Sequence, residues 1–588
     1  MFGVIRLPTT KTLIIAYTKR TWPRYVFGLL TVIAATYFTA QVPRLLGVAI
    51  DYIQEARPPS EIVATAGHIA VAAFLAFALR FFWRFLILGY TRGVETYIRA
   101  QVFKHLETLS ADFYIKYNTG DIITRTISDL FFIRRMFGFS FVASLDAATI
   151  FLVVGINMFA QAGFAMSFAA ILPIPFLIMF IIIIRKHLRA RQYEIREAAS
   201  GLASKAQENL TGIRVIKAYS QEESEKDNFK SLSLVRWAKE MRLVRLSASI
   251  SPIIQIAFAV TFSIFIIFGS RMVADGQMTV GDFTAFNGYI LLMAIPISNI
   301  GRVVDVWQTG LSSFQRLDEI LIYKPSVTDD YAEEGTDVTE GRIELKNLTF
   351  AYPQCDPVLN NLSFTVHAGE TIAVTGAVGC GKTTLASILL RQWKIRQGMI
   401  AIDGNDINSI SVKKLRDAIG YVPQDNFLFS ETIMDNIRFY DTEISDEDVY
   451  AAAKAVSIHD NIMGFALQYD TVVGERGMTL SGGQKQRISI ARALVRKPKI
   501  LILDDCLSAV DAETEHNIIK GLKSYTEGVT GIIITNRVAA ASLADRILVL
   551  NENGSMAEMG TYDELMEAQG EFYKLSALQT GADLTENT

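Results

Sequence analysis

Residues 376–384, Gly-Ala-Val-Gly-Cys-Gly-Lys-Thr-Thr, have the composition and spacing of a phosphate-binding loop. They match G-x-x-x-x-G-K-[ST], follow a β-rich run at 370–375 and precede an apolar helical stretch at 385–393. The glycines let backbone N–H groups approach phosphate oxygens, and the following helix start favours an anion. Lys382 is expected to reach the β- and γ-phosphates and Thr383 to touch Mg²⁺. The residues expected to hold the nucleotide here are Gly376, Gly379, Cys380, Gly381, Lys382, Thr383 and Thr384.

Two further segments belong with this loop. The run Leu-Ile-Leu-Asp-Asp ends a predicted strand at 501–505, and the pentapeptide Leu-Ser-Gly-Gly-Gln occupies 480–484. With these motifs the chain resembles, over nearly its whole length, a half-transporter of the ATP-binding cassette (ABC) exporter superfamily. The pentapeptide beside a phosphate-binding loop is close to diagnostic. The resemblance implies an α-helical six-span transmembrane domain with long cytoplasmic helical extensions, then an α/β P-loop ATP-binding cassette with an antiparallel β subdomain and a helical subdomain.

The resemblance also implies roles for residues outside the loop. Tyr352 matches the aromatic residue that stacks on adenine, although an ordinary strand tyrosine is the alternative. Gln424 matches the glutamine that touches Mg²⁺ and the attacking water. The segment 471–477 matches the loop that contacts the cytoplasmic extensions, and Asp511 matches a residue facing the opposite nucleotide site. The expected cofactors are ATP and Mg²⁺, and the expected metal ligands are Thr383, Gln424 and Asp504.

In this family the phosphate-binding loop of one domain faces the Leu-Ser-Gly-Gly-Gln segment of another. One nucleotide domain cannot complete a site, so a dimer is implied. The segment expected to act on the partner's γ-phosphate consists of Ser481, Gly482, Gly483 and Gln484. By the same resemblance, coupling helices are expected near 111–121 and 216–226, at the tips of two long polar stretches.

Two residues depart from the family pattern at catalytic positions. Asp505 stands where the family has a glutamate that positions or deprotonates the attacking water. Its side chain is one methylene shorter, which withdraws the carboxylate by about 1.5 Å. Asn536, in Ile-Ile-Ile-Thr-Asn-Arg, stands where the family has a switch histidine, and all six histidines lie elsewhere. Asparagine can still donate a hydrogen bond but cannot carry an imidazolium charge.

These departures resemble the degenerate-site subunit of heterodimeric ABC exporters. The resemblance implies that this chain binds MgATP and hydrolyses it slowly, while a homologous half-transporter with an intact catalytic glutamate supplies the productive site. One alternative is a homodimeric lipid or drug exporter in which Asp505 is a slow base. Another is a nucleotide-gated membrane regulator that does not pump. A peptide-processing exporter is disfavoured, because no cysteine precedes Cys355 to act as an N-terminal nucleophile.

The elements around these motifs divide the chain into two chemically distinct parts. Residues 1–318 form the expected transmembrane domain, 319–340 a linker, and 341–588 the nucleotide-binding domain. An interfacial helix is expected at 7–22, with a disordered cytoplasmic tail as the alternative. Six runs approach the ~20 apolar residues that cross a bilayer, and they fall near 25–50, 66–90, 137–160, 163–184, 247–272 and 280–304.

The charge distribution sets orientation and limits partners. The long stretches 91–136 and 185–246 are rich in Lys and Arg, whereas the loop near 51–65 has only Arg57. The positive-inside rule therefore puts these stretches, both termini and the nucleotide domain in the cytoplasm of a multi-pass plasma (inner) membrane protein. A net charge of −3 suggests no nucleic-acid partner. The three cysteines all follow residue 354, which argues for a reducing compartment.

The substrate is not readable from these spans. They are rich in Phe, Ile, Leu and Ala, which suits a cavity for small amphipathic compounds and equally suits packing against lipid. Arg80 and Arg84 lie four residues apart in the second span, on one helix face. Asp146 and Asp305 are candidate partners for them in a substrate or gating contact, and the alternatives are a structural ion pair or snorkelling of the two arginines. Export of multidrug-like compounds follows only from the resemblance.

Overall fold

The computed structural model describes residues 9–474, 477, 480–506, 518, 521–522, 525 and 527–580. The chain folds into two compact units that are not contiguous in sequence. The first comprises the residues up to Glu107 together with Asn118–Tyr323. The second comprises Thr108–Tyr117 and the residues from Lys324 onward. The short segment Thr108–Tyr117 thus packs with the second unit, although its sequence neighbours on both sides belong to the first.

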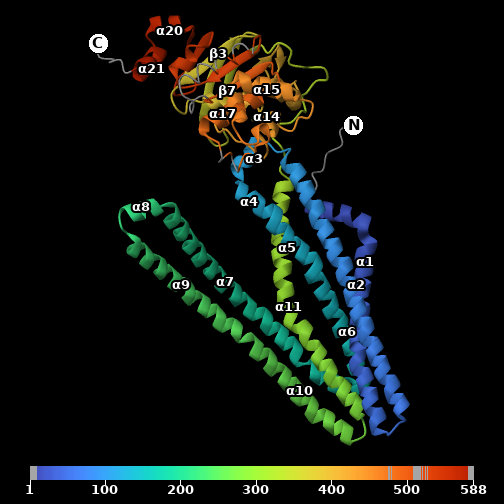
Figure 1. The fold of residues 1–588 in the computed structure, drawn as a ribbon. Coiled ribbons are helices and arrows are strands. Elements are labelled where there is room, and N and C mark those ends of the chain that lie inside the picture. Colours follow the sequence, from blue (N-terminus) through green and yellow to red (C-terminus); the bar gives the residue numbers. More distant parts are fainter. Residues whose placement is uncertain are drawn as a thin grey trace. The chain divides into compact units, whose positions relative to one another are not determined.

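Long helices build the described part of the first unit (Figure 1). In Figure 1, α7 and α9 lie side by side and are joined through α8. The elements are α1 (Thr10–Gln54), α2 (Pro59–Leu106), α4 (Thr119–Thr124), the π-helical turn η1 (Arg125–Asp129), α5 (Leu130–Arg135), the π-helical turn η2 (Met136–Ser140), α6 (Phe141–Ile171), α7 (Pro173–Thr211), α8 (Ile213–Ala218), α9 (Glu222–Ala248), α10 (Ile250–Ala274) and α11 (Val280–Leu321).

Five helical stretches of the described chain are long and apolar enough to cross a bilayer, at Thr10–Gln54, Pro59–Leu106, Thr119–Phe164, Glu222–Ala274 and Val280–Leu321. The predicted count of six spans is therefore not confirmed. The remaining expected span, 163–184, begins at a kink inside α6, where Gly163 has a φ of 71°, and crosses the junction of α6 and α7 at Leu172. The apolar part of α7 then ends at Ile184, just before Arg185 and Lys186.

Close contact joins α1 to α11. Asp51 near the end of α1 accepts hydrogen bonds from the Gly281 backbone N–H at 2.7 Å and from the Thr279 hydroxyl at 2.8 Å. A Cβ atom on Gly47 would lie 2.4 Å from the Gly281 carbonyl oxygen. This approach therefore requires glycine, and it lets the Asp51 carboxylate bond the start of α11.

The intramembrane charges find different partners from those expected. Arg80 donates to the Thr39 hydroxyl at 3.1 Å. Asp146 accepts a hydrogen bond from Thr36, on the same helix as Thr39. Asp305 forms an ion pair with Arg189 at 3.3 Å. Hydroxyl groups of α1 thus solvate one cation and one carboxylate within the spans.

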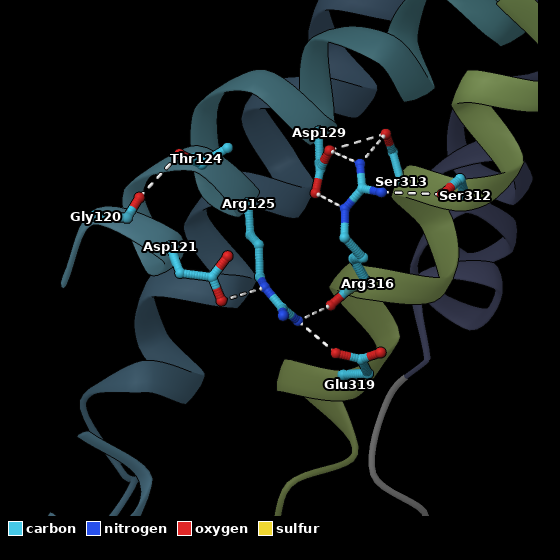
Figure 2. A network of polar contacts seen from close by, with 9 residues as sticks. All are labelled: Gly120, Asp121, Thr124, Arg125, Asp129, Ser312, Ser313, Arg316 and Glu319. Atoms are coloured by element: carbon cyan, nitrogen blue, oxygen red, sulfur yellow. Dashed lines mark hydrogen bonds and ion pairs between the residues drawn. The ribbon is translucent and has the colours of Figure 1, made fainter. Parts of the chain in front are cut away.

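A buried polar network fastens η1 to the end of α11 (Figure 2). Asp129 is 1% exposed and forms a bidentate pair with Arg316. Its Oδ2 accepts a hydrogen bond from Arg316 Nε at 2.9 Å, and its Oδ1 accepts one from Arg316 Nη2. Ser313 donates to the same carboxylate at 2.9 Å. Arg125 forms a second arm, donating to Asp121 at 2.9 Å and to Glu319 at 2.6 Å. The network therefore holds η1, in the first long polar stretch, and the end of α11 together as one packed structure.

The second unit contains two sheets. A four-stranded antiparallel sheet has the order β2-β1-β4-β5, and a six-stranded sheet has the order β10-β9-β3-β8-β7-β6, parallel except for β10. The strands are β1 (Ile343–Ala351), β2 (Pro357–Val366), β3 (Thr371–Gly376), β4 (Ile400–Ile402), β5 (Asn405–Asp406), β6 (Ile419–Val422), β7 (Ile500–Asp504), β8 (Thr530–Ile534), β9 (Arg546–Leu550) and β10 (Met556–Gly560).

Helices cover the parallel sheet, whose apolar strands are buried on both faces. α14, α15 and α17 pack on one another around a separate apolar cluster, which forms the expected helical subdomain. The described helices of this unit are α3 (Ala111–Lys116), α12 (Lys382–Leu389), α13 (Val412–Ala418), α14 (Ile433–Arg438), α15 (Asp446–Ala455), α16 (His459–Met463), the 3₁₀ turn η3 (Gln468–Asp470), α17 (Gly482–Leu494), α19 (Val538–Ala541), α20 (Tyr562–Ala568) and α21 (Glu571–Thr580).

The first expected coupling segment, 111–121, is divided between the units. α3 lies in the second unit, where Ala111 packs against the core of the antiparallel sheet. Asp112 accepts from the Ser326 hydroxyl at 2.8 Å, and Ser110 accepts from the Val327 backbone N–H at 3.0 Å. The chain entering the nucleotide domain is therefore hydrogen-bonded to the segment that precedes η1 in sequence.

The Asp129–Arg316 pair gives a testable stability prediction. We expect Arg316→Met to destabilise the protein by about 2–3 kcal/mol, because it leaves the buried Asp129 carboxylate without its cation, while the partial exposure of Arg316 reduces the effect. The Asp129→Leu/Arg316→Met double variant should recover much of this loss, because no buried charge remains. Thermal unfolding in detergent measures both, with Arg236→Met on exposed α9 as the control. Equal losses in the single and double variants would contradict the prediction.

Candidate nucleotide site

Four neighbouring strands of the parallel sheet, β3, β8, β7 and β6, end at one edge. The phosphate-binding loop follows β3, Asn536 lies two residues after β8, Asp504 ends β7, and Gln424 lies two residues after β6. Because carboxyl ends of parallel strands meet at the same edge, groups far apart in sequence converge here.

A pocket of about 330 Å³ lies at this edge, within the size range of small-molecule sites. It is lined by Tyr352, Val358, Val378, Gly379, Gly381, Lys382, Thr383, Thr384, Gln424, Asp504, Asp505, Ile534, Thr535 and Asn536. Most of the residues that the sequence predicts for this chain's own site thus share one pocket. Gly376 and Cys380 are not among the lining residues.

The phosphate-binding loop is held by its own lysine. Lys382 Nζ donates to the carbonyl oxygens of Gly376 at 2.9 Å and Ala377 at 2.8 Å. Gly376 has a φ of 143°, and a Cβ atom there would lie 2.4 Å from the Leu550 carbonyl oxygen. Cys380 is 1% exposed, with its Sγ 3.7 Å from Lys382 Nζ. Gly376 and Cys380 therefore shape the loop from behind rather than lining the pocket.

Thr383 and Asp504 form an oxygen-rich corner of the pocket. The Thr383 hydroxyl donates to Asp504 Oδ1 at 3.1 Å. Asp504 is 1% exposed, and its Oδ2 makes no hydrogen bond. Burial raises the pKa of this carboxyl group, and the Asp505 carboxylate raises it further. A buried carboxylate with one oxygen that makes no hydrogen bond, beside a hydroxyl, fits Mg²⁺, which takes one or two carboxylates and completes its shell with phosphates and water.

The two departures from the family pattern both line this pocket. Asp505 follows β7 with a φ of 45°, and its backbone N–H donates to the Ile534 carbonyl at 2.8 Å. That bond fastens Asp505 to the end of β8, two residues before the exposed Asn536. The pocket therefore contains a short carboxylate and a neutral amide near the metal corner.

Tyr352 lies at the edge of the pocket and is half-buried. Its hydroxyl lies 2.9 Å from the Thr384 hydroxyl, and Trp393 packs edge-to-face with its ring at a centroid distance of 5.0 Å. These contacts fix the ring beside the phosphate-binding loop. Stacking of adenine on it stays a prediction.

The Leu-Ser-Gly-Gly-Gln segment opens α17 but does not line this pocket among the residues described. Ser481 caps the helix: its hydroxyl accepts from the Gln484 N–H at 3.2 Å, and Gln484 Oε1 accepts from the Ser481 N–H at 2.9 Å. Asp511 lies outside the described residues, as do Glu475 and Arg476 of the segment 471–477.

Sequence reasoning missed several contributors: Val358 and Val378 of the pocket lining, and three residues on or next to neighbouring strands. Thr535 and Ile534 line the pocket because β8 lies between β3 and β7. Tyr421, on β6, interacts with the Asp504 carboxyl group from the adjacent strand. Only the strand order identifies these neighbours, although the position of Thr535 directly before Asn536 was a usable signal.

Two family models match the chain. The model described as ABC transporter matches residues 359–508, and the model described as ABC transporter transmembrane region matches residues 25–297. Together they fall on both compact units.

Curated relatives match nearly the full length. The chain is 34% identical to a probable multidrug resistance ABC transporter ATP-binding/permease protein, YheI, of Bacillus subtilis, over 94% of this chain and 95% of that protein. It is 31% identical to the multidrug resistance-like ATP-binding protein MdlA of Escherichia coli, over 96% of each. It is 29% identical to an ATP-dependent lipid A-core flippase of Syntrophus aciditrophicus, over 95% of this chain and 93% of that protein.

A solved structure shares the fold. A bacterial Atm1-family ABC exporter with ATP bound aligns with a TM-score of 0.80 at 26% identity, covering 97% of this chain and 100% of that one.

The Thr383–Asp504 corner predicts how the site responds to metal. We expect Asp504→Asn to lower MgATP affinity by about ten- to a hundredfold, because a charge-assisted contact worth about 1.5–3 kcal/mol is lost. Affinity for ATP in excess EDTA should change little. Fluorescent-nucleotide binding to the full chain measures both, with Asp470→Asn in η3 as the control. An Asp504→Asn protein that keeps its full Mg²⁺ dependence would exclude a metal at this corner.

Proposed function

The chain belongs to the ABC transporter family, as an exporter half-transporter with one transmembrane region and one ATP-binding domain, and from that membership we propose a specific role. The chain is one half of a heterodimeric ATP-driven exporter. Its own site binds MgATP and turns it over slowly, and its Ser481–Gln484 segment completes the productive site of a homologous partner with an intact catalytic glutamate. The observation that carries the proposal is the pocket in which Asp505 and Asn536 adjoin most of the expected nucleotide-binding residues.

The chemistry at Asp505 explains slow turnover. Compared with glutamate, its carboxylate falls about 1.5 Å short of the attacking water. A misplacement of about 1 Å can cost about 10²-fold in rate, and loss of general-base catalysis costs about 10²–10⁴-fold. Asn536 offers a hydrogen bond to the γ-phosphate without a positive charge. Binding depends on Lys382 and the loop N–H groups, which are unchanged, so affinity and hydrolysis separate.

Surfaces of the first unit support a dimer. α9 extends over Glu222–Ala248 without a single buried residue. It nevertheless exposes large apolar side chains, among them Trp237 at 59% and Leu234 at 55%. α8, which overlaps the start of the second expected coupling region, 216–226, also has no buried residue and exposes Val215 at 61%. Such surfaces mark contact with a partner or with lipid. The long charged extension favours the partner.

The transported compounds are proposed to be hydrophobic or amphipathic. A cavity of about 750 Å³ in the first unit lies between α10 and α11. It is lined mainly by apolar side chains, which include Ile254, Phe258, Phe262, Ile290 and Leu291. The relatives described as multidrug resistance proteins and as a lipid A-core flippase handle substrates of this class by their names. The fourth expected span, 163–184, which includes the start of α7, is also part of the proposal and would bring the number of spans to six.

Closure of the nucleotide domains on ATP would be transmitted to this cavity through elements that pack against one another. ATP bound between two nucleotide domains draws them together, and hydrolysis at the partner's site resets them. Within the first unit, the Asp129–Arg316 network joins η1 to α11, one of the helices that line the cavity. The orientation of the extensions and both termini toward the cytoplasm, in a bacterial inner membrane, completes the proposal and rests on the positive-inside rule.

The first test is the steady-state ATPase rate of this chain purified alone in lipid nanodiscs. We expect the wild type to stay near a Lys382→Ala blank, and Asp505→Glu/Asn536→His to exceed it by at least about tenfold, because both catalytic groups are restored. Brisk wild-type turnover that Lys382→Ala abolishes would instead make Asp505 a working base and favour a homodimer.

The second test concerns the partner's site. The complex is isolated from the native membrane through a tag on this chain. We expect Gly482→Asp to abolish most of its ATPase activity, because a carboxylate would face the partner's γ-phosphate. Nucleotide affinity of this chain's own site should be unchanged. Gly464→Ala, on an exposed turn of the same subdomain, is the control. A complex that contains only this chain, or full activity of Gly482→Asp, would contradict the heterodimer.

A further inference from the structure

The end of the C-terminal helix is hydrogen-bonded to the backbone around Asn536. Gln579, in α21, donates from its side-chain Nε2 to the Asn536 carbonyl oxygen at 2.5 Å. The Oε1 atom of the same amide accepts from the Val538 backbone N–H at 3.0 Å. One side chain therefore spans Arg537 and holds the peptide groups on both of its sides. The segment so held connects β8 to α19 and carries a pocket-lining residue.

The same segment is fixed at its other end. The Thr535 N–H donates to the Val374 carbonyl at 3.1 Å, which ties it to β3 beside the phosphate-binding loop. The Arg537 N–H donates to the Thr535 hydroxyl at 3.0 Å. Asn536 lies between these anchors with its side chain exposed on the pocket. The backbone of this segment sets the direction of the Asn536 side chain, and Gln579 supplies the anchor at the end of the segment that leads to α19.

α21 is itself rigidly docked, which an anchor requires. Phe572 is fully buried in a cluster that includes Val538, Ala541 and Leu565. The backbone N–H groups of Glu571 and Phe572 donate to the Glu558 carboxylate at 2.6 and 3.2 Å. Gln579 is thus presented from a helix whose start is bonded to β10 and whose apolar face packs on α19.

We propose that Gln579 is a positioning residue of the nucleotide site, which aims the Asn536 side chain at the terminal phosphate of bound ATP. The C-terminal helix thereby acts on how this site distinguishes ATP from ADP. The inference rests on the part of the proposed function that assigns Asn536 to the γ-phosphate. A helix-docking role alone would stabilise the domain without changing this discrimination.

The test measures ATP and ADP affinities of the full chain, both with Mg²⁺. We expect Gln579→Ala to weaken ATP binding about three- to tenfold, the effect of losing one or two hydrogen bonds, and to leave ADP binding within about twofold. Gln579→Glu keeps the acceptor for Val538 but turns a carboxylate toward the Asn536 carbonyl, so it should weaken ATP binding similarly. Leu578→Ala, at an exposed neighbour on the same helix, should change neither affinity.

A double-mutant cycle separates this inference from its premise. Asn536→Ala alone should weaken ATP binding selectively, and Gln579→Ala should add little in that background, because both changes remove the same contact. If Asn536→Ala does not change the ATP-to-ADP affinity ratio, the assignment of Asn536 fails. If Asn536→Ala lowers the ratio but Gln579→Ala does not, or if Gln579→Ala weakens ATP and ADP equally with a lower thermal midpoint, Gln579 is structural and the inference is overturned. The ATPase comparison of Asp505→Glu/Asn536→His does not depend on either result.

Discussion

The nucleotide site depends on the pairing of parallel strands. The apolar strands of the parallel sheet, β3, β8, β7 and β6, are buried on both faces. Polar groups on these segments can therefore contact a ligand only where the strands end. Parallel pairing sends every carboxyl end to one edge. That single constraint brings the phosphate-binding loop, Asp504 and Gln424 to one pocket from segments widely separated in sequence. The metal corner, the altered catalytic groups and the anchor from α21 are all consequences of this edge.

Binding and hydrolysis use different groups at this edge, which is why one can change without the other. Phosphate binding relies on backbone N–H groups, glycine conformations and Lys382. Hydrolysis relies on a side chain that must reach a water to within a fraction of an ångström. Aspartate at 505 shortens the reach of the carboxylate, and asparagine at 536 removes the positive charge and the reach that a histidine would have. In the proposed function, this separation lets the subunit hold ATP at a dimer interface while its partner performs the chemistry.

The helical unit solves a different problem, because it must be stable in lipid and also transmit motion. Arg80 and Asp146 are hydrogen-bonded to hydroxyl groups, and Asp305 is paired with Arg189. The Asp129–Arg316 pair is costly to desolvate and is compensated by two-sided contact and by Ser313. An apolar substitute could give equal stability. The ionic version adds geometric specificity, since a bidentate pair holds η1 and α11 in one register.

The sequence by itself determined the motifs and their chemistry. The loop at 376–384, the pentapeptide at 480–484 and the two altered residues are readable because each depends on residue type at fixed local spacing. It also determined the division into an apolar helical part and a nucleotide-binding part. The number of spans was harder, because a hydropathy run at 163–184 cannot reveal that it begins at a kink at Gly163 and is divided between two helices just before Pro173.

Only the tertiary structure decided which distant residues meet. Strand order placed Thr535 and Tyr421 beside the metal corner, and Tyr421 carries no local signal for that role. Packing put α3 with the nucleotide unit rather than with its neighbours in sequence. The bond from Gln579 to Asn536 joins residues that no periodicity connects. Local spacing encodes motifs, whereas contacts between elements depend on how whole apolar faces are buried together, and that information is not local.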